Sequence, residues 1–153
     1  MRIALLCIGN EFRGDDGVGI EAGRQFEKRA AAGELQNEWQ VFFGGETPEN
    51  EFGAIREFAP QLVIVCDAVG GFKAGEVEFL NLQDERSYIF STHNIPSPIL
   101  LSYIRSFCQR VIFLGICVSI ENVLEIRQNL SSEAQNAVKK AVEKLTQVDE
   151  ISC

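Results

Sequence analysis

The chain has 153 residues, 46% hydrophobic and 24% charged, which is enough to bury a hydrophobic core and is the length of one domain rather than two. Its 14 lysines and arginines against 22 aspartates and glutamates give a formal net charge of −8. This excess of negative charge disfavours a nucleic-acid partner, because phosphate backbones bind to basic surfaces. The chain has a single histidine, His93, so a transition-metal site would take most of its ligands from carboxylate oxygens.

The cysteines and the first residues indicate the compartment. Five cysteines are present, an odd number, without a CxxC spacing, and three lie inside apolar runs where a buried thiol packs well. The apolar stretch at residues 3–8 ends at Gly9 and Asn10, too early for a signal peptide or a membrane span. We therefore expect a cytoplasmic protein without disulfides or membrane insertion. Because nothing in the sequence demands a dimer, we expect a monomer.

Apolar runs alternate with stretches of helical periodicity, a pattern typical of βαβ units and a parallel sheet. In chain order, the pattern predicts strand 3–8, helix 15–33, strand 39–43, helix 47–59, strand 62–66, strand 76–80, helix 96–107, strand 111–118 and a final helix from Ser132 with a capping box. The alternating polarity of residues 76–80 indicates an antiparallel edge strand. The whole pattern predicts one three-layer α/β domain over residues 1–153.

Two glycine patterns resemble nucleotide-binding motifs but lack their chemistry. Residues 9–14 follow a strand and precede a helix, as a P-loop does, yet Asp15 and Asp16 stand where a P-loop has lysine and a hydroxyl residue. Residues 17–22 match the dinucleotide fingerprint in letters, but a pyrophosphate there would meet the same two carboxylates. We therefore expect no nucleotide. A structural alternative is that Asp15 or Asp16 caps the helix while the glycines allow close packing.

Three polar residues are expected at the carboxyl edge of the sheet, where open parallel sheets bind ligands. If the strand order includes 2-1-3, the ends of the first and third strands meet, and Asp16 and Asp67 face each other. His93 lies in a connection that opens at the same edge. The residues alone do not rank Asp15 against Asp16. Structural alternatives are that Asp67 caps a turn before Gly70 and that His93 faces solvent.

Two carboxylates and one imidazole suit two kinds of chemistry. They form an open metal site that favours no particular divalent transition metal, because nickel, iron, manganese, cobalt and zinc all accept mixed oxygen and nitrogen donors. Alternatively, Asp16 and Asp67 share a proton and activate water, while His93 positions the substrate. No serine or cysteine is paired with His93 in the sequence in a way that indicates a covalent nucleophile.

The sequence resembles the maturation endopeptidases of nickel–iron hydrogenases, in particular those acting on the hydrogenase-3 type of large subunit. The likeness covers nearly the whole chain, in the family's order and spacing, and is carried by residues 9–19 (GNEFRGDDGVG), 44–50 (GGETPEN), 65–68 (VCDA), 91–96 (STHNIP) and 111–116 (VIFLGI). It implies a twisted, mostly parallel five-stranded sheet between helices, with Asp16, Asp67 and His93 contacting a metal and Asp16 and Asp67 as catalytic residues. Glu46 departs from the small residue that relatives often carry beside the threonine.

The resemblance implies an endopeptidase that removes a short C-terminal extension from a hydrogenase large-subunit precursor once nickel has been inserted. The implied cofactor is nickel held jointly with the substrate. A site of two carboxylates and one imidazole is short of strong ligands, so we expect weak nickel affinity in the absence of the precursor. Two other functions stay open: a non-catalytic metal-sensing or chaperone module for the immature hydrogenase, and a metallohydrolase of small substrates.

Overall fold

The computed structural model describes residues 1–70, 73–80, 97–124, 126–127 and 129–152. These residues form a five-stranded sheet in the order β2-β1-β3-β5-β4. The strands are β1 (Arg2–Ile8), β2 (Glu38–Gly45), β3 (Leu62–Val69), β4 (Val77–Leu80) and β5 (Val111–Cys117). Strands β2, β1, β3 and β5 run parallel to one another, and β4 runs antiparallel to β5 at the edge of the sheet. The predicted mostly parallel sheet with one antiparallel edge strand is confirmed.

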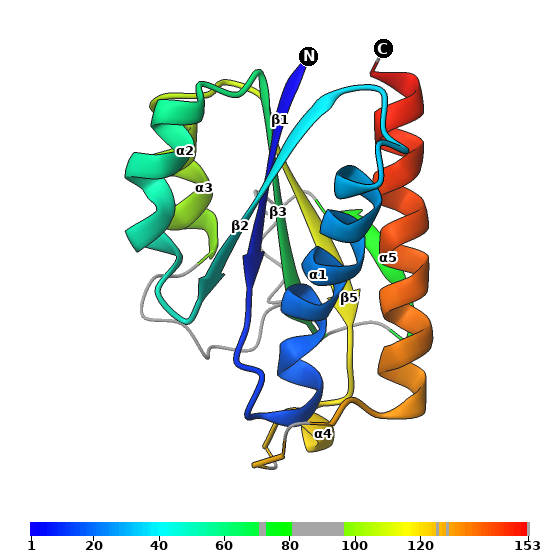
Figure 1. Cartoon of the computed structure of the whole chain (residues 1–153). Helices are drawn as coiled ribbons and strands as arrows, with labels where there is room; N and C mark the ends of the chain where they lie inside the picture. Colours follow the sequence, from blue (N-terminus) through cyan, green and yellow to red (C-terminus); the bar gives the residue numbers. More distant parts are fainter. Residues whose placement is uncertain (71–72, 81–96, 125, 128, 153) are drawn as a thin grey trace.

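Helices cover both faces of this sheet. The helical elements of the described part are η1 (Gly14–Gly17), α1 (Val18–Ala31), η2 (Pro48–Glu51), α2 (Phe52–Phe58), α3 (Ser97–Arg105), α4 (Ile120–Leu124) and α5 (Ser132–Ile151). Figure 1 shows α1 and α5 on one face and α2 and α3 on the other, which confirms the three layers. None of the helices in the described ranges is long and apolar enough to cross a bilayer.

Strand β1 lies between β2 and β3, and its two buried faces explain why residues 3–8 form an unbroken apolar run. Successive side chains of a strand point to opposite faces. Ile3, Leu5 and Cys7 pack into the core beneath α1 and α5, whereas Ala4, Leu6 and Ile8 pack into the core with α2 and α3. Because helices bury both faces, neither set is polar. Strand β3 is buried along its whole length in the same way.

Several helix ends differ from the prediction. Neither Asp15 nor Asp16 caps α1, since both lie in the 3-10 turn η1 and the N-cap residue is Gly17, without a side-chain hydrogen bond. The final helix is capped by Ser131 rather than by a box beginning at Ser132; the Ser131 hydroxyl accepts a hydrogen bond of 3.1 Å from the amide of Ala134. The short helix α4 was not predicted, because it has five residues and buries Val123 alone.

The order of the strands creates a crevice at one edge. From β1 the chain crosses to β2 on one side, and β3 then lies on the other side of β1. The crossovers therefore leave in opposite directions, and the carboxyl ends of β1 and β3 lie side by side where the order reverses. Ligands bind at this position in open α/β sheets, and the chain places the Asn10–Asp16 turn and Asp67 there.

Candidate active site

Asp16 is held against the end of β1 by a tight turn. Its carboxylate is buried, with the residue 1% exposed, and Oδ2 accepts a hydrogen bond of 2.9 Å from the backbone amide of Asn10. The turn requires glycine at position 9, because φ is +148° there and a Cβ atom would lie 2.2 Å from the carbonyl oxygen of Asp16. The backbone conformation of this turn thus fixes Asp16 at the carboxyl edge of the sheet.

Asp67 lies two residues before the end of β3, which extends to Val69 and is longer than the predicted strand 62–66. The residue is fully buried, and its Oδ1 accepts a hydrogen bond of 2.8 Å from the amide of Ala68. Asp67 is one residue beyond the last position of β3 that pairs with β1, and it still pairs with Gly115 of β5. The turn η1, which carries Asp16, contacts β3. The structure therefore brings the Asp16 and Asp67 segments together, as the strand order predicts.

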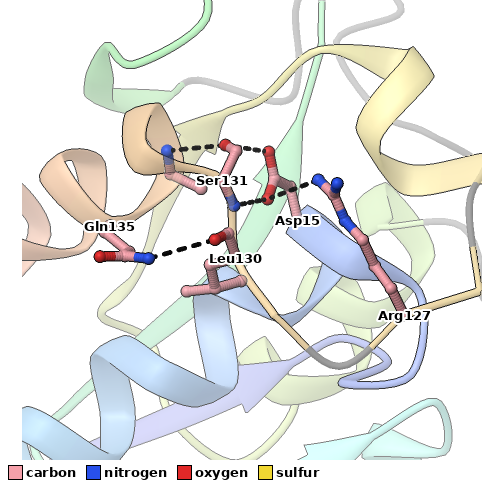
Figure 2. A network of polar contacts seen from close by, with 6 residues as sticks. Asp15, Arg127, Leu130, Ser131 and Gln135 are labelled. Carbon is pink, nitrogen blue, oxygen red and sulfur yellow. Dashed lines mark hydrogen bonds and ion pairs between the residues drawn. The ribbon is translucent and has the colours of Figure 1, made fainter.

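Asp15 points to a different part of the molecule, as Figure 2 shows. Its two carboxylate oxygens accept hydrogen bonds from the amide and hydroxyl of Ser131, at 2.8 and 2.7 Å, and Oδ1 lies 3.8 Å from a guanidinium nitrogen of Arg127. Asp15 is thus joined to the residue that caps α5. This geometry gives the two adjacent aspartates different partners, a distinction that the residues alone could not make.

The segment around Arg127 holds the Asp16 turn in place. The amide of Arg127 donates to the carbonyl of Phe12, at 2.9 Å, and the amide of Gly14 donates to the carbonyl of Arg127, at 2.8 Å. These bonds and the Asp15–Ser131 pair join the loop after β1 to the connection before α5. Sequence reasoning missed both Ser131 and Arg127, since they lie more than a hundred positions away along the chain; the only signal was the doubled aspartate.

The third predicted site residue, His93, lies outside the described residues. Among the residues that are described, no group of three His, Cys, Asp or Glu side chains is placed to hold a metal ion. Asp16 and Asp67 offer oxygen donors, which suit divalent cations but do not complete a shell for a transition metal. A metal at this edge needs further donors from His93, from water or from a bound substrate.

The thiols nearest to the site are not suited to act as nucleophiles or metal ligands. Cys7 and Cys66 are completely buried. Burial raises the pKa of the Cys66 thiol, and the negative charge of Asp67 raises it further. Burial likewise raises the pKa of the Cys7 thiol. Because the thiolate is the reactive form of cysteine, the raised pKa values make these two thiols poor nucleophiles at neutral pH.

A cleft of about 680 Å³ opens beside the Asp16 turn. Gly9 and Asn10 line it at the end of β1, and further lining residues come from the following loop, from α1 and from the end of β2: Glu11, Phe12, Ile20, Arg24, Glu27, Phe43, Gly45, Glu46 and Thr47. Asn10 belongs both to the cleft and to the hydrogen bond that holds Asp16. The cleft therefore adjoins the turn that carries Asp16, and much of its lining comes from the sequence motifs 9–19 and 44–50.

The fold and these carboxylates define a small α/β protein with a site at the switch point of its sheet, and comparison with known proteins identifies the family. Residues 21–148 match the family model described as hydrogenase maturation protease. The chain belongs to this family, as the sequence resemblance predicts. The matched range includes Asp67 and begins after Asp16, so the place of Asp16 in the site rests on the geometry given above.

Individual relatives agree with this assignment. The hydrogenase 3 maturation protease of Escherichia coli K12 is 38% identical over 118 residues, which are 76% of this chain and 72% of that protein. A crystal structure of an uncharacterized protein from Wolinella succinogenes is 44% identical, covers 100% of both chains and has a TM-score of 0.81. The solution structure of the endopeptidase HycI from Escherichia coli is 32% identical, covers 97% of this chain and 91% of that one, and has a TM-score of 0.79.

Proposed function

We propose that this protein is an endopeptidase that removes the C-terminal extension of a nickel–iron hydrogenase large-subunit precursor after nickel insertion, and that it recognises the bound nickel. The observation that carries the proposal is the pair of buried carboxylates, Asp16 and Asp67, held at the carboxyl ends of adjacent strands in a chain of the hydrogenase maturation protease family. Burying two acidic side chains at the carboxyl edge of the sheet costs free energy, and these side chains do not contribute to the apolar core.

The two carboxylates can move the protons that peptide hydrolysis requires. Water attacks the carbonyl carbon of the scissile bond, its proton passes to a carboxylate oxygen, and a proton is delivered to the leaving amide nitrogen. Two aspartates at one site can divide these tasks, because like charges in proximity favour one shared proton. The amide of Asn10 and the amide of Ala68 fix the orientation of the two carboxylates before substrate arrives.

The nickel in this proposal belongs to the precursor. Asp16, Asp67 and His93 are the residues that contact it, and the precursor supplies the remaining ligands. A bound divalent metal polarises a neighbouring carbonyl oxygen. The oxygen atoms of Asp16 and Asp67 supply only part of a nickel coordination shell, and the loaded precursor supplies the rest. The protein therefore distinguishes nickel-loaded from nickel-free precursor.

The test is incubation of the protein with nickel-loaded large-subunit precursor, followed by intact-mass spectrometry. We expect the precursor to lose a C-terminal fragment, and we expect nickel-free precursor to keep its full mass. Asp67→Asn should abolish cleavage while leaving the circular dichroism spectrum and cooperative unfolding intact. Shortening of the nickel-free precursor at the same rate would overturn nickel recognition.

The same experiment separates the alternative functions. A precursor that binds but keeps its full mass would identify a non-catalytic metal-sensing or chaperone module. Hydrolysis of small peptides or esters without any precursor, accompanied by nickel that stays bound through purification, would identify a metallohydrolase of small substrates. Either result would replace the processing endopeptidase.

A further inference from the structure

The cleft beside Asp16 has apolar walls that remain open to solvent. Phe12 is 59% exposed and Phe43 is 37% exposed, and the two rings belong to the loop after β1 and to the end of β2. Ile20 of α1 adds a buried aliphatic side chain to the lining. Exposed aromatic rings along a cleft are suited to contact another polypeptide, because they offer large contact areas at a small cost in side-chain entropy.

The charges of the cleft are predominantly negative. Its lining includes Glu11, Glu27 and Glu46 against one arginine, Arg24. That arginine is already neutralised, since its guanidinium lies 2.5 Å from Glu11 and 3.6 Å from Glu21. Glu46 turns one carboxylate oxygen to the side-chain amide of Asn10, at 3.0 Å, and Glu27 is exposed on α1. A ligand in the cleft thus meets uncompensated carboxylates as well as aromatic faces.

We propose that this cleft binds an extended segment of the hydrogenase precursor that carries lysine or arginine residues between apolar ones, next to the scissile bond. The inference rests on the proposed function, since it takes the precursor as the partner. Basic side chains satisfy the carboxylates of Glu27 and Glu46 and can also stack on the rings of Phe12 and Phe43. Because Asn10 lines the cleft and its backbone amide also binds Asp16, a segment bound here lies beside the turn that carries Asp16.

The test reverses one charge of the cleft that touches neither candidate catalytic residue. Glu27→Lys should raise KM for the nickel-loaded precursor about tenfold and leave kcat unchanged, because it removes binding that is equal in the ground state and the transition state. Glu27→Gln should give a smaller increase in the same direction. Glu57→Lys is the matched control: Glu57 is exposed on α2, on the opposite face of the sheet, and the substitution changes the net charge equally.

A charge exchange on the substrate completes the test. A precursor whose basic residues near the cleavage site are changed to glutamate should be processed poorly by the original protein and better by Glu27→Lys. If Glu27→Lys and Glu57→Lys have the same KM, the cleft does not bind the precursor, and the endopeptidase proposal still stands. A second copy of the chain as the occupant would appear in light scattering as a dimer that Glu27→Lys dissociates, and would overturn the inference.

The dissociation constant of the protein–precursor complex distinguishes a failure of the cleft proposal from a failure of the endopeptidase proposal. It should rise about tenfold with Glu27→Lys, the same factor as KM. If the original protein binds precursor without shortening it and Glu27→Lys still weakens that binding, the endopeptidase proposal fails and the cleft assignment holds. If Glu27→Lys leaves the dissociation constant unchanged, the cleft assignment fails whether or not the precursor is cleaved.

Discussion

Asp15 and Asp16 are adjacent in the sequence and equally buried, yet they have different partners. Asp15 binds Ser131 and approaches Arg127, while Asp16 binds the amide of Asn10 at the end of β1. Successive residues of a tight 3-10 turn point in different directions, so the doubled aspartate serves two purposes. A sequence pattern does not reveal which aspartate turns which way, because the partner of Asp16 is in the same loop whereas Ser131, the partner of Asp15, lies 116 positions along the chain and reaches it only through folding.

Substitution of each aspartate in turn tests this division of roles. Asp16→Asn should abolish precursor cleavage while the protein still folds cooperatively. Asp15→Asn should retain cleavage but lower the free energy of unfolding by about 1–3 kcal/mol, since the buried hydrogen bonds to Ser131 are weakened. Intact-mass spectrometry and urea titration, run side by side, give both quantities. Cleavage by Asp16→Asn together with inactivity of a folded Asp15→Asn would reverse the assignment.

A third aspartate, Asp149, stabilises the fold far from the site. Its carboxylate accepts hydrogen bonds from the amides of Gln36 and Asn37, at 2.8 and 2.9 Å, and from the indole nitrogen of Trp39, at 2.8 Å. Burial by itself raises the pKa of this carboxyl, but the hydrogen bonds from Gln36, Trp39 and Asn37 outweigh it and lower the pKa below its usual value. The ionised form therefore joins the end of α5 to the start of β2.

This lowered pKa makes the stability depend on pH. The folded state holds the Asp149 proton less tightly than the unfolded state, so the contribution is complete above the unfolded pKa of about 3.9 and is lost as the pH falls through the lower folded pKa. Asp149→Asn should cost about 1–3 kcal/mol at neutral pH. The difference between the two proteins should shrink in acid. Urea titrations over a range of pH measure both effects; a difference that stays constant into acid would contradict this role.

At the scale of elements, the approach of α1 to the sheet places the site. A Cβ atom on Gly19 would lie 2.5 Å from the carbonyl oxygen of Ile8, 2.8 Å from that of Cys66 and 3.4 Å from the Cα atom of Asp67. The first turn of α1 therefore presses on the ends of β1 and β3 and holds the two carboxylate segments together. Gly19 of the motif that resembles a dinucleotide fingerprint thus allows close helix–strand packing, one of the alternatives that the sequence left open.

Gly19→Ala tests this close contact. The new methyl group would displace backbone rather than a flexible side chain, so we expect a loss of about 1–3 kcal/mol in the free energy of unfolding. We also expect precursor cleavage to fall by more than the unfolded fraction explains, because the ends of β1 and β3 must move apart. Gly53→Ala is a suitable control, since a Cβ atom at Gly53 meets nothing within 4 Å. Equal behaviour of the two variants would show that the contact at Gly19 is not needed.

Elements with strong local patterns were predictable, and those that depend on distant partners were not. The parallel strands were predicted from apolar runs, which reflect burial on both faces of the sheet. Strand β4 was predicted from the alternation of polar and apolar residues. The short helix α4 and the cap at Ser131 depend on what packs around them. The rule that parallel strands present their carboxyl ends together predicted that the aspartate pair after β1 and Asp67 lie at one edge, and only the family resemblance ranked Asp16 over Asp15. Two motifs of that resemblance, residues 9–19 and 44–50, line much of the cleft, but their meeting there with α1 depends on the tertiary structure.

At the scale of the whole molecule, two apolar core clusters stabilise the fold. Core clusters lie on both faces of the sheet, and the candidate site occupies one edge of it. We therefore expect a chelator to leave the melting temperature of the isolated protein unchanged. Nickel should bind to the isolated protein more weakly than to its complex with precursor, and His93→Ala should weaken that binding further. Equilibrium dialysis and thermal unfolding check these expectations; a melting temperature that falls on chelation would indicate a resident structural metal.

The sequence by itself predicted the α/β class and the mostly parallel sheet, which the structure confirms, because hydrophobic periodicity is a local property of the chain. It also named Asp16, Asp67 and His93 as site residues through the family resemblance, and that assignment stays a prediction. The tertiary structure decided what separate segments do to one another. It placed Asp15 against Ser131, brought the Asp16 turn to β3, and formed the acidic cleft from β1, α1 and β2. Such contacts depend on the order of strands and the direction of crossovers, which no single stretch of sequence specifies.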